Sequence, residues 1–302
     1  MAQISVLIPV YNAQSYLAEC LDSLLAQDFQ DWEAICVNDG STDDSTKILT
    51  EYANKDNRIK VISQQNQGQA CGRNVLLDNA SAPWQMFLDS DDKLTPNALS
   101  LLYRMAQESN QPVIVPTAFG SIYDATAPAT GTYQICQPAL AVLLKKPHLY
   151  SSACGKLYRA DILKDHRFIP HIFFEDWPFI TTLFAKIPSF ALTRDVIYLY
   201  RQTPNSTMRS EFSEDKIDNY MTGIEFVNKA LNNTPQEQLG KKRCSIAARM
   251  CINKTWRDRN RSELAKHLVQ RIDAAHQQGY FLWRYISLKV MIRYLIMKYL
   301  QK

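Results

Sequence analysis

Short apolar runs alternate with amphipathic stretches over the first 110 residues, and this alternation restricts the possible folds most strongly. Four runs have the length and composition of buried strands, at residues 4–10, 32–37, 59–63 and 84–88. Between them, apolar residues recur at the three- and four-residue spacing of one helix face, as in residues 15–27. Strands that alternate with helices predict an α/β fold with a mostly parallel, doubly wound sheet.

The pattern becomes less regular after residue 110. Expected elements are a helix at 96–109, a strand at 113–117, an irregular excursion over 120–135, helices at 137–145 and 180–186, and a strand at 195–201. From about residue 212 the pattern is helical to the end, so we expect a mainly helical C-terminal region after the sheet.

Charge divides the chain into three parts. Residues 1–110 carry 7 basic and 15 acidic side chains, residues 111–240 carry 12 of each, and residues 241–302 carry 15 basic and 3 acidic ones. The seven cysteines lie singly without a CxxC pair, which argues against a disulfide framework and a structural zinc site. No secretory signal is visible at the start of the chain, so we expect a reducing cytoplasmic location.

An acidic cluster closes the fourth apolar run. Residues 84–88 are followed by three carboxylates within four positions, at Asp89, Asp91 and Asp92. Such anions repel one another unless a cation lies between them, and Mg²⁺ or Mn²⁺ binds carboxylate oxygens while sharing phosphate oxygens. The position favours a metal–phosphate site, because open α/β sheets bind ligands at the carboxyl ends of their strands. The alternative is a polar loop that only caps the next helix.

Four polar loops follow the four apolar runs, and all can open on one edge of the sheet. They are residues 9–12, residues 38–41, the loop around Gly68 and residues 89–92. Ordinary turn chemistry explains Asn, Asp and Gly in any single loop, but four loops at consecutive strand ends favour a shared ligand site.

The side chains of these loops match the parts of a nucleoside diphosphate. Tyr11 supplies a flat face for a base, and Asp39 can accept the imide N–H of uracil. Gly40 and Gly68 let the main chain approach a ligand closely, and Arg73 can neutralise phosphate. The chain lacks G-x-G-x-x-G after the first run and lacks G-x-x-x-x-G-K-[ST], which counts against a dinucleotide oxidoreductase and a P-loop phosphotransferase.

Four segments together carry a family resemblance. They are ISVLIPVYN at 4–12, VNDGSTD at 37–43, Asn66-x-Gly68 with Arg73-Asn74, and FLDSDD at 87–92. In order and spacing they resemble the family 2 glycosyltransferases of the GT-A fold. The resemblance continues more weakly at 155–159 and 174–179, and it departs at Gly72, where the family usually has alanine.

The resemblance implies an inverting transfer of a sugar from a nucleotide sugar, most often a UDP-sugar, with the help of a divalent metal, Mn²⁺ or Mg²⁺. It implies that the following residues bind the donor: Pro9, Val10, Tyr11, Asn12, Asp39, Gly40, Ser41, Gly68, Arg73, Asp89, Ser90 and Asp91. Asp91, with Asp89, would hold the metal on the diphosphate. Asp176 would be the general base, and Glu175 would hold the local geometry or bind acceptor.

The resemblance also implies the domain organisation and the biological setting. Residues 1–210 would form the GT-A catalytic domain, with nucleotide-sugar binding in 1–110 and acceptor binding in 111–210, and residues 211–302 would form the helical C-terminal region. The acceptor would be a glycan or a lipid-linked glycan, as in the synthesis of bacterial capsule, lipopolysaccharide or exopolysaccharide.

The pair Glu175-Asp176 suits a base because it lies in an apolar, aromatic stretch. Desolvation there would raise a carboxylate pKa, and an inverting displacement needs a base opposite the leaving diphosphate. The alternative is that the pair caps the helix beginning near Pro178. Lys156, Arg159 and Arg201 are further candidates for phosphate or acceptor contact, as are Ser206 and Thr207 beside Arg201 and the histidines 148, 166 and 171 near the acceptor region; surface or packing roles are the alternative.

The tail, residues 280–302, mixes five basic residues with many aromatic and aliphatic ones and contains no acid. Its longest run between charges is four residues, too short to span a bilayer. It can lie in the interface of an anionic membrane, or it can dock on the protein as an ordinary helix.

Two other functional classes remain to be compared with a sugar transferase. The basic C-terminal part suggests a binder of nucleic acid or of another anionic surface, although it is more apolar than a solvated basic arm. A non-catalytic relative that only binds nucleotide sugar is the second, and the intact Asp39, Asp89, Asp91 and Asp176 argue against it.

Overall fold

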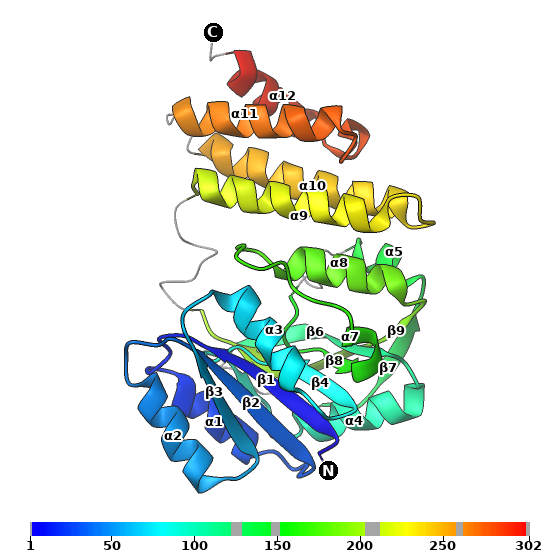
Figure 1. Cartoon of the computed structure of the whole chain (residues 1–302). Coiled ribbons are helices and arrows are strands. Elements are labelled where there is room, and N and C mark those ends of the chain that lie inside the picture. The colour runs from blue at the N-terminus through cyan, green and yellow to red at the C-terminus, as the bar shows by residue number, and fades with distance from the viewer. Residues whose placement is uncertain (1, 122–128, 146–151, 203–211, 258–261, 300–302) are drawn as a thin grey trace. The chain divides into compact units, whose positions relative to one another are not determined.

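The computed structural model describes residues 2–121, 129–145, 152–202, 212–257 and 262–299. The chain divides into two compact units, one formed by Met1–His171 with Ile187–Gln202, the other by Ile172–Lys186 with Thr203–Lys302. The first unit contains a mixed but largely parallel sheet flanked by helices, and the second is helical (Figure 1). The predicted α/β class with a helical C-terminal region is therefore confirmed.

Nine strands within the described residues form one sheet. They are β1 Ile4–Val10, β2 Trp32–Asp39, β3 Ile59–Gln64, β4 Trp84–Phe87, β5 Lys93–Leu94, β6 Val113–Ser121, β7 Tyr133–Cys136, β8 Leu157–Arg159 and β9 Phe190–Tyr200. Their order is β3-β2-β1-β4-β8-β6-β9-β5, and β7 pairs with β9. The first four strands are parallel, β8 runs antiparallel to β4 and β6, and β9 is parallel to β6.

The first half of the sheet positions the polar loops. β1 and β2 are buried along their whole length, as expected for central parallel strands with near-continuous apolar sequence. Val10 pairs with Asn38, and Leu7 pairs with Phe87. The carboxyl ends of β1, β2 and β4 therefore meet at one edge, where the loops that follow them begin.

The first unit also contains helices, most of which pack on the sheet. They are α1 Leu17–Leu25, α2 Ser45–Lys55, α3 Gln69–Asn79, α4 Ala98–Ser109, α5 Ala139–Leu143 and α7 Ala160–Leu163. α3 packs on β1 and β2, whereas α1 packs against α2 and β5, and α4 packs against β6, β8 and β9. The buried residues of α1, which include Leu17, Leu21 and Leu24, follow the helix-face spacing read from the sequence.

Three parts of the fold differ from the sequence-based expectation. The sequence pattern predicts a helix over 73–79, but α3 begins at Gln69, because Gly68 at φ 88° ends the loop in a conformation that favours glycine. Within the expected irregular excursion, β6 continues to Ser121 and β7 forms an edge strand on β9. The last strand begins at Phe190, earlier than the pattern at 195–201 indicated.

The second unit is a stack of helices. They are α8 Asp176–Lys186, α9 Glu214–Leu231, α10 Glu237–Arg257, α11 Ser262–Gln277, the short 3₁₀ turn Trp283–Tyr285 and α12 Leu288–Tyr299. α9 packs on α8, α10 and α11, and α12 packs on α10 and α11. Among the described residues, no helix has the length and apolar character that crossing a bilayer requires. The tail helix α12 docks on α10 and α11, and its outer side carries exposed apolar side chains.

Candidate functional site

The first two polar loops are joined by the side chain of Asn12. Its main-chain N–H donates to Ser41 Oγ at 3.0 Å, and its Oδ1 accepts from the N–H of Thr42 at 2.8 Å. Asn12 has φ 48°, a left-handed conformation that asparagine tolerates better than most residues. These contacts fix the loop after β1 against the loop after β2, and the ring of Tyr11 stands exposed between β1 and Asn12. Pro9 and Val10 are buried within β1 beneath it.

Asp39, at the end of β2, holds the loop before α3. Its Oδ1 accepts from Gln64 Nε2 at 2.6 Å and from the N–H of Gln67 at 2.9 Å. Its Oδ2 accepts from the N–H of Gly68 at 2.8 Å. A carboxylate offers about four acceptor positions, so these three donors leave one for a ligand.

Two glycines are needed for different reasons. Gly40 has φ 72°, and a Cβ there would come within 2.8 Å of the main-chain N of Asn66. Gly68 has φ 88° but nothing lies within 4 Å of the position of its missing Cβ. Gly40 is therefore required by close packing as well as by conformation, whereas Gly68 is required by conformation alone.

Asp92 anchors the acidic cluster from inside. Its side chain is almost completely buried, Oδ2 accepts from the Tyr198 hydroxyl at 2.6 Å, and Oδ1 accepts from the N–H of Arg201 at 2.7 Å. Burial, and after it the charge of Asp89, raises the pKa of Asp92 to about 8. Both carboxylate oxygens of Asp92 are thus hydrogen-bonded, one to Tyr198 of β9 and the other to Arg201, which follows β9.

Arg201 supports the same turn from the side. Its Nε donates to the main-chain oxygen of Asp91 at 2.9 Å, and its Nη2 pairs with Glu19 Oε2 at 2.9 Å. The guanidinium also lies 4.5 Å from the centre of the Tyr16 ring. The hydrogen bond from Arg201 lowers the pKa of Glu19, which keeps that carboxylate charged as a partner. Arg201 therefore fixes the backbone that carries Asp91.

Asp89 is held from below by α3. Arg73 Nη2 pairs with Asp89 Oδ1 at 3.0 Å, and Gln69 Nε2 donates to the same oxygen at 3.3 Å. The Arg73 side chain is only 1% exposed, so it lies under Asp89 and not on the surface. The main-chain N–H of Asp89 donates to the Tyr198 hydroxyl at 3.2 Å.

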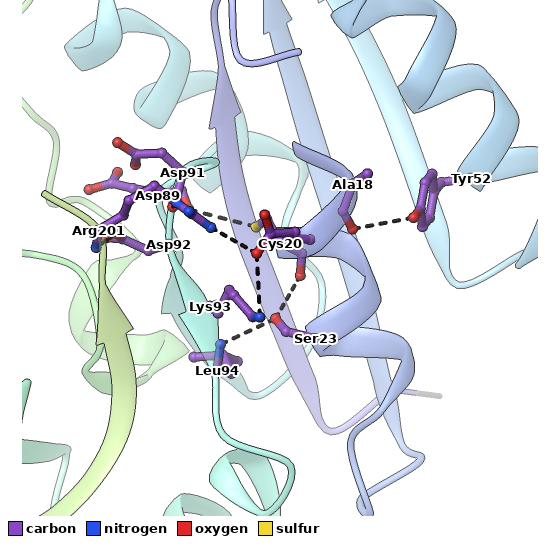
Figure 2. A network of polar contacts seen from close by, with 11 residues as sticks. Ala18, Cys20, Ser23, Tyr52, Asp89, Asp91, Asp92, Lys93, Leu94 and Arg201 are labelled. Atoms are coloured by element: carbon purple, nitrogen blue, oxygen red, sulfur yellow. Dashed lines mark hydrogen bonds and ion pairs between the residues drawn. The ribbon is translucent and has the colours of Figure 1, made fainter. Parts of the chain in front are cut away.

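Asp89 and Asp91 are the carboxylates that remain available to a ligand. Figure 2 shows their side chains extending to the same side of the strand end, with the half-buried Ser90 between them in the chain. Burial, and after it the negative charge of Asp89, raises the pKa of Asp91 to about 6.

This pair of carboxylates fits a hard divalent cation. Such an ion relieves the repulsion between two neighbouring carboxylates, and Mg²⁺ in particular is commonly bound by one or two carboxylates together with substrate phosphates. In the described parts of the chain, no three His, Cys, Asp or Glu side chains form a metal-binding group. The protein thus offers part of a coordination shell, and the rest has to come from the ligand and water.

Glu175 and Asp176 belong to the second unit. Glu175 is buried, and Asp176 is the half-buried first residue of α8. Phe174 before them stacks on Tyr220 of α9 at 4.5 Å between ring centres, and Trp177 after them lies 4.9 Å from the guanidinium of Arg243. The aromatic setting expected from the sequence is therefore present around the pair.

Other candidates from the sequence have local partners. Lys156 is buried and donates to the main-chain oxygen of Ser152, and Arg159 pairs with Asp161 at 2.8 Å. His166 is buried, His171 lies 3.7 Å from Cys71 Sγ, and residues 148, 206 and 207 lie outside the described residues. Sequence reasoning missed Tyr198 and Glu19, because no local pattern connects either of them to the acidic cluster.

The family of the chain follows from its match over the first unit. Residues 5–167 match the model of glycosyl transferase family 2. The chain belongs to this family. The predicted membership is thereby confirmed, and with it the class of enzyme.

Relatives and solved structures agree with this membership. Glycosyltransferase GlyG of Streptococcus pneumoniae is 29% identical over 69% of this chain and 74% of its own length. The poly(ribitol-phosphate) beta-glucosyltransferase of Bacillus spizizenii is 32% identical over 66% of this chain, a match that spans 32% of that protein. Residues 1–349 of S. aureus TarS, solved with UDP-GlcNAc, superpose with a TM-score of 0.75 at 22% identity, covering 99% of this chain and 91% of that one. The likeness to TarS confirms the GT-A fold.

Proposed function

We propose that this family 2 glycosyltransferase is a metal-dependent, inverting enzyme that transfers a sugar from a UDP-sugar to a hydroxyl of a glycan or lipid-linked glycan. The proposal rests on the pair Asp89 and Asp91, which Arg73, Tyr198 and Arg201 hold at the strand-end edge. TarS was solved with UDP-GlcNAc, and the B. spizizenii relative is named a poly(ribitol-phosphate) beta-glucosyltransferase. A UDP-sugar in one neighbour and a phosphate-polymer acceptor in the name of one relative support bacterial surface polysaccharide synthesis as the setting.

The donor nucleotide would lie across the loops after β1 and β2. The exposed ring of Tyr11 offers a stacking face, and the free acceptor position of Asp39 suits the imide N–H of uracil. Asn12 and Ser41 keep the two loops together, and Gly68 presents main chain beside Asp39. The buried position of Arg73 supports a role in positioning Asp89, in place of the direct phosphate contact expected from the sequence.

Asp91, together with Asp89, would hold Mn²⁺ or Mg²⁺. A divalent ion bound there supplies positive charge for the leaving diphosphate. Asp92 does not belong to this set, because both of its oxygens are used by Tyr198 and Arg201. Its part is to keep the turn that presents Asp91 in one conformation.

Asp176 would act as the general base. The acceptor hydroxyl gives its proton to the Asp176 carboxylate while its oxygen bonds to the anomeric carbon. The bond from that carbon to the diphosphate oxygen breaks on the opposite face, which inverts the anomeric configuration. Glu175, buried beside it, would orient this segment or contact the acceptor.

A lipid-linked acceptor would place the enzyme at the inner face of the cell membrane, as a cytoplasmic protein in peripheral contact with it. The alternative of a nucleic-acid binder is weakened because the helices that carry the basic C-terminal residues pack on one another through their apolar faces. No extended basic arm is seen among the described residues of this part.

The function is tested by incubating the full chain with a panel of UDP- and GDP-sugars, with Mn²⁺ or with a chelator. We expect hydrolysis or transfer from a UDP-sugar that is lost on chelation, and a product of inverted configuration by NMR. Binding of UDP–Mn²⁺ without turnover of any donor would favour the non-catalytic relative. Turnover that survives complete chelation would contradict metal dependence.

A further inference from the structure

α12 has two apolar faces, one packed inside the second unit and one exposed. Val290, Tyr294 and Met297 are buried, and they recur at the spacing of one helix face. This inner face packs on α10 and α11. The tail helix is therefore part of the core of the second unit.

Polar contacts fix the rotation of α12 about its own axis. The Tyr294 hydroxyl donates to Asp273 Oδ1, and Lys298 Nζ pairs with Asp273 Oδ2 at 2.7 Å. Arg293 Nη1 donates to Asn253 Oδ1 at 2.5 Å. Since these partners lie on α10 and α11, the opposite face of α12 is held outward.

The outer face is a continuous apolar stripe. Its residues and their exposed fractions are Leu288 67%, Ile292 47%, Leu295 40%, Ile296 37% and Tyr299 61%. They follow the i, i+4, i+7, i+8, i+11 spacing of one side of a helix. Single exposed apolar residues are ordinary, but among the residues that the structure describes, most of the large exposed hydrophobic side chains gather here, which marks an interaction surface.

Basic side chains border this stripe. At 3.6 residues per turn, Lys289 and Arg293 flank one side, and Lys298, whose charge is paired with Asp273 of α11, flanks the other. α12 itself contains no acidic residue. Residues 241–302, which include most of α10 and all of α11 and α12, carry 15 basic and only 3 acidic side chains. An apolar stripe with a basic border at Lys289 and Arg293 is complementary to an anionic lipid surface, where acyl chains bury the stripe and headgroups meet the charges.

We propose that the outer face of α12 inserts into the interface of an anionic membrane and holds the enzyme there. The helix axis would lie along the membrane surface. The helix has 12 residues, about 18 Å, so it can lie in the interface but cannot cross the bilayer. Pairing with a second copy is disfavoured, because it would bring two sets of basic borders together. The inference rests on the proposed membrane location for its biological purpose, while membrane binding itself needs no catalysis.

The test compares the full-length protein with a variant carrying Leu288→Gln, Ile292→Gln, Leu295→Gln and Ile296→Gln. Glutamine is a good helix former, so these exposed positions should tolerate it. The matched control is Ile135→Gln, which removes an exposed apolar residue of β7 in the other unit. Each protein is sedimented with vesicles of phosphatidylcholine alone or mixed in equal parts with phosphatidylglycerol.

We expect the wild type and Ile135→Gln to bind the anionic vesicles at low salt, and the fourfold variant to bind about tenfold or more weakly. UDP affinity should be equal in all three, which separates this result from any failure of the proposed catalysis. Lys289→Gln should weaken vesicle binding and lower its salt dependence.

Three results would overturn the inference. One is a wild type that does not sediment with anionic vesicles, and a second is a fourfold variant that sediments like the wild type. The third is a wild type that forms a dimer in solution which the fourfold variant loses, because a second copy would then occupy the face. A circular dichroism melt of the variant confirms that it is folded; should it be unfolded, the single change Leu288→Gln at the most exposed position must still weaken binding.

Discussion

The hydroxyl of Tyr198 lies 2.6 Å from Oδ2 of Asp92, although the two residues are 106 positions apart in the chain. The same hydroxyl accepts from the N–H of Asp89 at 3.2 Å. One side chain from β9 therefore fixes both ends of the turn that presents Asp91. This relationship connects the second half of the sheet to the proposed metal site.

Tyr198→Phe should loosen this turn while leaving the aromatic packing intact. Asp92 would lose a donor in a buried position, which costs about 1–3 kcal/mol of the free energy of unfolding. The affinity for UDP with Mn²⁺ should fall as well, because Asp89 and Asp91 are no longer held in one arrangement. Urea unfolding and calorimetric titration measure the two effects. A variant with wild-type stability and wild-type affinity would show that the Tyr198 hydroxyl neither stabilises the fold nor positions Asp89 and Asp91.

Asp195 joins β9 to the segment before β7, and its contribution to the free energy of unfolding should depend on pH. Oδ1 and Oδ2 accept from the N–H groups of Thr130 and Gly131, each at 2.8 Å. Burial alone would raise the pKa of Asp195, but these hydrogen bonds outweigh it and hold the pKa below its ordinary value of 3.8. Asp195→Asn leaves one N–H facing an amide N–H₂ and should cost about 1–3 kcal/mol.

The sign of the pH effect follows from the lowered pKa of Asp195. The ionised carboxylate stabilises the fold above its unfolded-state pKa of 3.8, and this contribution is lost as the pH falls through the lower folded-state value. The difference in unfolding free energy between wild type and Asp195→Asn should therefore be largest near neutral pH and become smaller below pH 3.8. A difference that grows on acidification would contradict the assignment.

Asp176→Asn should separate donor binding from catalysis. Removing a general base lowers turnover by about 10² or more, whereas UDP binding should be unchanged. Glu175→Gln is the matched comparison, since it changes the neighbouring buried carboxylate in the same way. Steady-state transfer rates and titration with UDP give the two readouts. If Glu175→Gln is inactive and Asp176→Asn nearly normal, the base is Glu175.

The sequence predicts the first half of the fold well because local patterns determine it. The apolar runs of β1 to β4 and the polar residues after them are contiguous, so both the strands and the shared edge can be read from periodicity. β8, with three residues, and β5, with two, are too short to carry a period.

Sequence reasoning missed Tyr198, and it named Arg73 and Arg201 without their partners, because these partners are distant in the chain. Arg73 is basic and follows the glycine loop, which suggests phosphate, but tertiary packing buries it beneath Asp89. Arg201 and Tyr198 come from β9 or follow it directly, and only the sheet brings them to the acidic cluster. The domain boundaries and the roles of individual site residues remain predictions for experiment.

The central claim, that Asp91 binds the metal that holds the donor diphosphate, is tested most directly by calorimetric titration of UDP with and without Mn²⁺. The proteins are the wild type, Asp91→Asn and the control Asp44→Asn, which changes an exposed aspartate before α2 in the same unit. We predict that Mn²⁺ strengthens UDP binding to the wild type and to Asp44→Asn, and that Asp91→Asn, although folded, loses this Mn²⁺-dependent gain. An Asp91→Asn variant that binds UDP–Mn²⁺ as tightly as the wild type would contradict the account.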